Sequence, residues 1–173
     1  IKNRPSAYYH GLYDSVRGTG ITKSLSSNRT EQEGFLSTNH NLVSFDSDGF
    51  TLGSTSNTNT LNTSGQSHVA WNWKAGGTAV SNTDGSITSS VSANTDAGFS
   101  IASYSGTGSA ASFGHGLATE PSMVIVKGRN VSVDWVVYHK DLGKDKFLYL
   151  NGTNAVGTIS NYWGAGGVTN SVV

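Results

Sequence analysis

The sequence predicts an all-β protein, built as an antiparallel β-sandwich or a β-barrel. Three observations carry this prediction. Short apolar runs rich in β-branched and aromatic residues recur along the chain, Gly and Asn clusters separate them at short spacing, and no long stretch has a helical period of 3.6 residues. Many short strands with turn signals between them are typical of sandwiches and barrels.

The strands are recognised by alternation or by continuous apolar character. Residues 99–104 alternate apolar and small polar side chains, as a strand with one buried face does. Residues 122–127 are almost all apolar, which predicts a strand buried on both faces. Helix is expected only as a single turn at residues 30–33. Strands are expected at residues 49–53, 68–73, 99–104, 122–127, 134–139 and 146–150.

Residues 78–97 differ from the rest of the chain. This segment, TAVSNTDGSITSSVSANTDA, has no aromatic residue and few large aliphatic ones. Asn82-Thr83-Asp84-Gly85 is a strong turn signal, because Asp-Gly supplies the positive φ angles of a tight hairpin. The segment is therefore predicted to be a connector of two short edge strands, and to mark a domain boundary.

Composition limits the function classes. The formal net charge is zero and only 13% of residues are charged, whereas nucleic-acid binding needs a basic surplus. The chain has no cysteine, so a disulfide framework and a cysteine-based zinc site are excluded. No apolar run approaches the roughly 20 residues that span a bilayer, so no membrane insertion is expected.

A motif near the start of the chain recurs near its end. The match has a constant offset of 125 residues, which becomes 123 after a two-residue insertion near Thr19-Gly20. Self-similarity of this kind is the signature of tandem units. Because Arg4 and Arg129 both recur, a structural salt bridge or hydrogen bond is expected there. The matched pairs are Lys2/Lys127, Arg4/Arg129, Tyr13/Tyr138, Gly18/Gly143, Leu25/Leu148, Asn28/Asn151 and Thr30/Thr153.

The order of the parts predicts a domain organisation. Residues 1–77 are expected to be the C-terminal part of one sandwich unit, residues 78–97 the connector, and residues 98–173 the N-terminal part of a second, similar unit. Both units then look truncated, as in a window onto a longer tandem array. The alternative is one domain with an internal duplication.

Several strings in the chain resemble a family of domains in marine bacteriophage virion proteins. They are SFDSDGFTLGS, NTSGQSHVAWNWKAGG, NTDGSITSSVSANTDAGFSIASYSG, GHGL with the later MVIVK, and WVVYH with LYLN. The resemblance implies a concanavalin-like or laminin-G-like jelly-roll sandwich, often in tandem, within a tail-fibre or other structural protein. It supplies no catalytic residue.

Asp46 and Asp48 are the candidate calcium ligands. They lie in Asp46-Ser47-Asp48-Gly49, and closely spaced carboxylates on a turn supply the oxygen ligands that calcium prefers. The competing interpretation is a plain turn in which the Asp side chains bond their own backbone. No other cofactor is expected.

Four aromatic residues are candidates for glycan binding: Trp71, Trp73, Tyr162 and Trp163. Trp71 and Trp73 share one face of a strand, because side chains two apart point the same way. They either fill the core or the contact with the connector, which the surrounding strand pattern favours, or form a platform for sugar rings. Trp163 lies in a Gly-rich loop and is the better candidate for exposure. Trp135 is expected in the core.

No catalytic pair is found. Glu31 and Glu33 would splay apart in an extended chain, and no G-x-S-x-G elbow occurs. The favoured hypothesis is therefore a non-enzymatic virion component, a tail fibre, head fibre or decoration protein. Its expected partners are other virion proteins and copies of itself, trimers being typical of fibres, with a host surface glycan as a further partner. The alternatives are a carbohydrate-binding adhesin module and a polysaccharide depolymerase.

Overall fold

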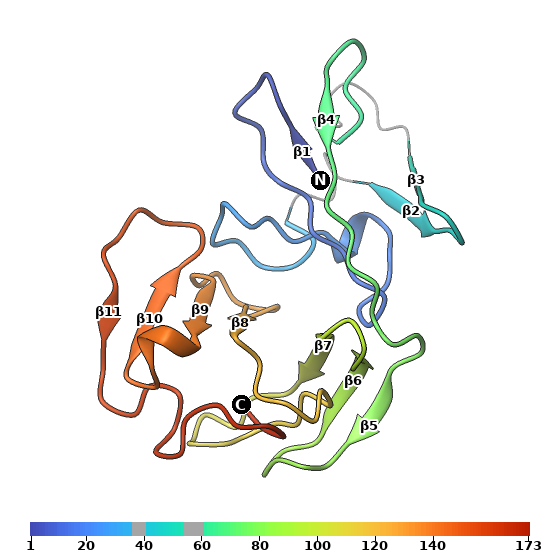
Figure 1. The fold of residues 1–173 in the computed structure, drawn as a ribbon. Helices are drawn as coiled ribbons and strands as arrows, with labels where there is room; N and C mark the ends of the chain where they lie inside the picture. The colour runs from blue at the N-terminus through green and yellow to red at the C-terminus, as the bar shows by residue number, and fades with distance from the viewer. Residues whose placement is uncertain (36–40, 54–60) are drawn as a thin grey trace. The chain divides into compact units, whose positions relative to one another are not determined.

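The computed structural model describes residues 1–35, 41–53 and 61–173, and its regular secondary structure is almost entirely β, in short strands joined by long loops (Figure 1). The described residues contain no α-helix, only two short 3-10 helices, Ile21–Lys23 (η1) and Lys140–Leu142 (η2). The strands are Lys2–Asn3 (β1), Leu42–Phe45 (β2), Phe50–Leu52 (β3), His68–Val69 (β4), Val80–Asn82 (β5), Ser89–Asn94 (β6), Phe99–Tyr104 (β7), Met123–Val126 (β8), Val136–His139 (β9), Lys146–Tyr149 (β10) and Gly157–Thr158 (β11).

The chain divides into two compact units. Unit 1 comprises residues 1–72, 127–135 and 150–152, and unit 2 comprises residues 73–126, 136–149 and 153–173. This division differs from the predicted split into residues 1–77 and 98–173. The difference arises because residues 127–135 pair with the N-terminal segment of the chain, as described below.

Unit 1 is held by two small antiparallel pairs and a few large apolar side chains. β1 pairs with β4, and β2 pairs with β3 around an irregularity in register. Leu25, Leu42 and Leu61 are at most 5% exposed and form its core. A Cβ at Gly11 would lie 2.8 Å from a Leu61 methyl carbon, so the buried Leu61 side chain would have to shift to admit it.

The first sheet of unit 2 contains the predicted connector. β5, β6 and β7 form a three-stranded antiparallel sheet with β6 at its centre. The prediction of two edge strands was therefore wrong for β6. Ser89 and Ser92 look polar in sequence, but both are buried and donate hydrogen bonds to the Gly114 and Gly77 carbonyls. Small hydroxyl residues satisfied by backbone can thus line a central strand.

The second sheet of unit 2 has the order β11-β10-β9-β8 and is antiparallel throughout. Val137, Tyr138 and Phe147 are buried in it. β8 was predicted to be buried on both faces, and this was wrong. Met123 is 56% and Ile125 43% exposed, because β8 is an edge strand and only one of its faces is covered.

Other local predictions met mixed outcomes. β7 spans the predicted residues, and β3, β8, β9 and β10 lie within their predicted ranges. In contrast, the predicted strand 68–73 is paired only at His68–Val69, so Trp71 and Trp73 lie outside it. The predicted helical turn at residues 30–33 is not helical.

Candidate functional site

A buried arginine organises the polar centre of unit 1. The side chain of Arg17 is 7% exposed, and its Nε donates to Asp14 Oδ2 at 2.5 Å. Its Nη1 donates to Glu33 Oε1 at 2.7 Å and to the Lys23 carbonyl at 2.8 Å. Asp14 in turn accepts hydrogen bonds from the backbone N–H groups of Val16 and Arg17, which fixes the turn. A buried guanidinium is thus paired and hydrogen-bonded, as a buried charge requires.

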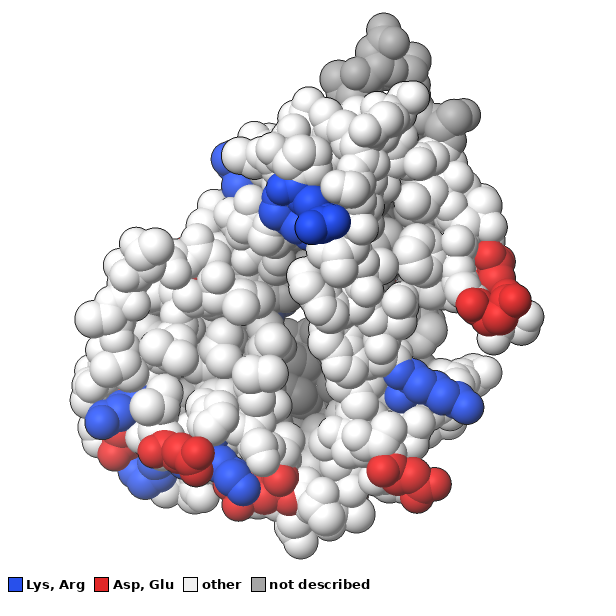
Figure 2. All heavy atoms as spheres, turned by 45° about the horizontal axis from the view of Figure 1, so that its top comes forward, with Lys and Arg blue, Asp and Glu red and all other residues white. Residues whose placement is uncertain are grey.

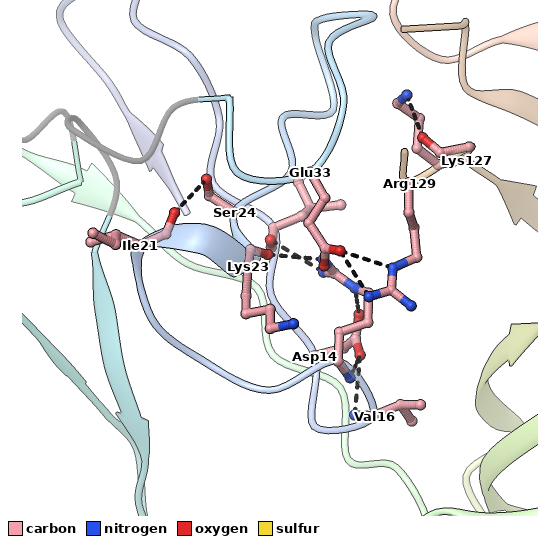
Figure 3. A network of polar contacts seen from close by, with 11 residues as sticks. Asp14, Val16, Ile21, Lys23, Ser24, Glu33, Lys127 and Arg129 are labelled. Carbon is pink, nitrogen blue, oxygen red and sulfur yellow. Dashed lines mark hydrogen bonds and ion pairs between the residues drawn. The ribbon is translucent and has the colours of Figure 1, made fainter. Parts of the chain in front are cut away.

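Glu33 connects this centre to a distant part of the chain. Its Oε2 accepts from Arg129 Nη2 at 2.8 Å and from Arg129 Nε at 3.0 Å (Figure 3). Its backbone N–H also donates to the Arg129 carbonyl at 2.8 Å. Burial alone would raise the pKa of Glu33, but the hydrogen bonds and charges of Arg129 and Arg17 hold that pKa below its usual value. Glu33 is therefore an anion between two cations.

Residues 127–135, here the docking hairpin, are held on residues 24–34, here the docking loop. Both segments belong to unit 1. Besides the Arg129–Glu33 pair, Lys127 Nζ donates to the Thr30 carbonyl at 3.1 Å. The indole N–H of Trp135 donates to the carbonyls of Ser26 at 2.9 Å and Arg29 at 3.1 Å. Trp135 is 5% exposed, which confirms the prediction that it is a core residue.

The docking hairpin is the start of the second copy of the sequence motif, and the first copy has the same internal contacts. Lys2 Nζ donates to the carbonyls of Asn3 at 2.5 Å and Ser6 at 2.9 Å. Lys127 Nζ donates to the carbonyls of the residues one and four positions later, Gly128 at 2.8 Å and Val131 at 3.3 Å. In each copy the lysine therefore closes the hairpin that it begins.

Backbone pairings recur at the same offsets. Ile1 and Gly11 exchange two hydrogen bonds, and Val126 pairs with Val136 in β8 and β9. Gly20, with a φ of 97°, precedes η1, and Gly143, with a φ of 81°, follows η2. In both cases the glycine carbonyl accepts a hydrogen bond from the N–H three residues later. The further equivalent contacts are Leu12–Leu25 and Val137–Leu148, Ser24–Gly34 and Phe147–Gly157, His10–Asn28 and Trp135–Asn151, and Gly20–Lys23 and Gly143–Lys146.

These contacts show that the motif is a folded feature and not only a run of similar letters. The equivalence covers residues 1–34 and 126–157. The salt bridge expected at the recurring arginines is present at Arg129. In the described parts of the chain Arg4 forms no such ion pair. The sequence showed the repeat, but it did not show that Glu33 accepts Arg129.

The four aromatic residues predicted to bind glycans differ in their exposure and in their contacts. Trp71 is 61% and Trp73 67% exposed, so the interpretation that they fill the core was wrong. They lie past the end of β4, and within residues 1–35, 41–53 and 61–173 no strand pairs with them. The Trp73 ring stacks beside Phe99 at a centroid distance of 6.1 Å, within unit 2.

Tyr162 and Trp163 are brought together in unit 2. The Trp163 indole N–H donates to the Lys146 carbonyl at 2.9 Å, and the ring meets Tyr138 edge to face at 5.5 Å. Tyr162 stacks on Phe147 at 4.3 Å. Trp163 is therefore half-buried and fixed by packing, although its Gly-rich loop predicted exposure.

Asp46 and Asp48 lie on the exposed β2–β3 turn. The carboxylate of Asp46 accepts from the hydroxyls of Ser44 at 2.8 Å and Thr51 at 2.9 Å, and its N–H donates to the Gly49 carbonyl. The backbone bond is that of a turn, but the Asp46 carboxylate bonds neighbouring hydroxyls and not the backbone that the turn interpretation named. Across residues 1–35, 41–53 and 61–173, no three His, Cys, Asp or Glu side chains gather as a metal site would need. Calcium binding stays a prediction.

Charged side chains are sparse on the face of the molecule that Figure 2 draws. Figure 2 shows small separate groups of basic and acidic residues on a face that is otherwise uncharged. In the described segments, no helix has the length and apolar character needed to cross a bilayer.

Fold and site together define an almost all-β protein of small antiparallel sheets, in which a hairpin-and-loop motif occurs twice and its second copy begins by docking on the first. The chain belongs to the family described as domain of unknown function DUF7483, whose model matches residues 1–173. No curated protein and no solved structure matches the chain.

Proposed function

We propose that the protein is a non-enzymatic structural component of a bacteriophage virion, a tail fibre, head fibre or decoration protein that acts in particle assembly. The observation that supports this proposal is the docking of the second motif copy on the first through Glu33 and Arg129. Proteins built from repeated units gain stability from interfaces between neighbouring units, and they form extended assemblies without any catalytic centre.

The finer architecture belongs to the same proposal. The small sheets are parts of jelly-roll sandwich units of the concanavalin or laminin-G type, arranged in tandem. Their partners are other virion proteins and copies of this protein, on the outside of the particle. The resemblance of strings such as HVAWNWKAGG to virion domains supports this placement, as does a surface with few charges.

The proposal is tested in particles. Virions are purified by density gradient from a phage that encodes this sequence, and their proteins are identified by mass spectrometry. The expected result is a full set of peptides from this chain at a copy number comparable to other structural proteins. Immunogold labelling then shows on which part of the particle it lies. Its absence from intact particles, with abundant protein in the host lysate, would contradict the proposal.

A second candidate function is recognition of host surface glycans. The observation that favours it is the exposure of Trp71 and Trp73, since sugar rings stack on exposed aromatic faces. A glycan array probed with the protein is expected to give hits that Trp73→Ala abolishes, while Trp163→Phe keeps them because that indole is fixed by packing. Equal binding by both variants would remove the assignment to Trp73.

A further inference from the structure

We infer that residues 2–10 of one chain dock on residues 147–157 of a second copy of this chain, head to tail. The inference deepens the proposed function, on which it rests, by naming the surface through which copies assemble. Within one chain, the docking hairpin already sits on the docking loop. Residues 2–10 are the counterpart of that hairpin, and residues 147–157 are the counterpart of that loop.

The counterpart hairpin is preformed. Its start pairs with β4 and the Arg4 N–H donates to the Ser67 carbonyl, whereas side chains further along it are uncovered. Lys2 closes it with the same two hydrogen bonds that Lys127 makes. Arg4, Ala7 and Tyr8 are exposed, and Tyr8 is 40% exposed. Among the described residues Arg4 has no carboxylate partner, whereas its counterpart Arg129 is paired with Glu33.

The counterpart loop is also preformed, and most of it is exposed to solvent. Phe147 pairs with Gly157 as Ser24 pairs with Gly34. Residues 152–156 are all exposed. Leu150 is 44% and Val156 43% exposed. Their counterparts at offset 123 are Ser27 and Glu33, which are partly covered. Two large apolar side chains are thus exposed on a loop whose equivalent in the first copy is contacted by the docking hairpin.

The hydrogen bonds to backbone groups that hold the docking hairpin on the docking loop can also form between residues 2–10 and residues 147–157, because they do not depend on the side chains of the loop. Lys2 Nζ would donate to the partner's Thr153 carbonyl, as Lys127 does to Thr30. The partner's Val156 N–H would donate to the Arg4 carbonyl, as Glu33 does to Arg129. Neither the Thr153 carbonyl nor the Val156 N–H has a hydrogen-bond partner among the described residues. The ion pair does not transfer, because Val156 replaces Glu33.

Such a contact is heterologous, since it joins two different surfaces, and it therefore builds rings or filaments and not closed pairs. This geometry suits a fibre or a decoration layer. The missing carboxylate makes the contact weaker than the one within the chain. It also supplies a gain-of-function test.

The chain has no cysteine, so specific cross-linking is straightforward. Arg4→Cys and Val156→Cys are prepared as two separate variants and oxidised alone or mixed. A disulfide-linked dimer is expected only in the mixture. Cross-linking of either variant alone to the same extent, or none in the mixture, would overturn the head-to-tail contact. Circular dichroism checks that both variants are folded.

Sedimentation velocity over a concentration series gives the second test. Val156→Glu restores a carboxylate opposite Arg4 and is expected to tighten self-association roughly tenfold, with Val156→Gln as the uncharged control. Adding Arg4→Ala to Val156→Glu should cancel the gain. A chain that stays monomeric in all these variants overturns the inference. If that monomer is still found in virions, the proposed function stands and only this interface fails. If the chain self-associates but is absent from virions, the interface stands and the proposed function fails.

Discussion

Lys2 and Lys127 close their hairpins in the same way, each donating from Nζ to the carbonyls one and four residues later. The two lysines are 125 positions apart, and the pairings around them recur at matching offsets. Two segments of similar sequence thus share a local structure. The two hairpins differ in their contacts with other segments of the chain. Lys127 also donates a hydrogen bond to the Thr30 carbonyl on the docking loop.

Glu33→Gln is expected to lower the free energy of unfolding by about 2 kcal/mol, because it removes the carboxylate that Arg129 and Arg17 share and leaves the buried Arg17 with only one carboxylate, Asp14. Urea unfolding measured by tryptophan fluorescence checks this. The matched control is Glu31→Gln, whose partner Arg29 is 38% exposed. An exposed pair of this kind is worth about 0–1 kcal/mol. Equal effects of the two variants would contradict the role of Glu33.

Stability should fall in acid through Glu33. Its folded-state pKa lies below the usual value, so the folded state favours the ionised form. The resulting stabilisation is present above the unfolded-state pKa of 4.5 and is lost as pH falls through the folded-state pKa. Unfolding followed from pH 7 downward should show a steeper loss for the parent than for Glu33→Gln. Parallel curves for the two proteins would mean that Glu33 is not the group responsible.

Asn28 and Asn151 are expected to be equally important in their own copies. Asn28 Oδ1 accepts from the His10 N–H at 3.0 Å, and Asn151 Oδ1 accepts from the Trp135 N–H at 2.8 Å. Alanine at either position should cost about 1–2 kcal/mol, since a backbone donor loses its partner. Asn151→Ala should also shift Trp135 fluorescence to the red. The control is Asn154→Ala on the exposed loop, and a loss of similar size there would refute the assignment.

Tyr13 should make the fold sensitive to alkali. Burial raises the pKa of Tyr13 to about 12, and weaker contributions from the Leu42 backbone, Ser24 and Arg17 act in the other direction. Because the folded-state pKa is above the unfolded value of 10.0, stabilisation is present below pH 10 and is lost as pH rises toward 12. Tyr13→Phe should lose less stability than the parent over this interval. An unchanged alkaline slope in the variant would argue against this role.

Strand positions could be predicted where side chains alternate or where β-branched residues cluster, as at Phe99–Tyr104 and Met123–Val126. Burial was harder to predict. β8 reads as a central strand, yet it is an edge, and β6 reads as an edge because its serines are satisfied by backbone carbonyls that the sequence does not show. Local periodicity reports the faces of a strand but not its neighbours in a sheet.

The candidate site was only partly visible in the sequence. Arg129 recurs as Arg4 in the first copy of the motif, and a salt bridge or hydrogen bond was expected there. Its partner Glu33 was considered only as a catalytic carboxylate, because an ion pair across 96 positions leaves no local pattern. The exposure of Trp71 and Trp73 was not predicted, because residues 68–73 alternate as a strand would. In the structure the strand ends at Val69, so neither tryptophan lies in it.

The most direct test of the account is a double-mutant cycle between Glu33 and Arg129. The free energy of unfolding is measured for the parent, Glu33→Gln, Arg129→Gln and the double variant. Docking of the second motif copy on the first predicts a coupling free energy of about 1–2 kcal/mol, and a clearly smaller value for the matched cycle of Glu31 with Arg129. Additive effects at Glu33 and Arg129 would show that the two residues do not interact, and the docking hairpin would then not be held on the docking loop.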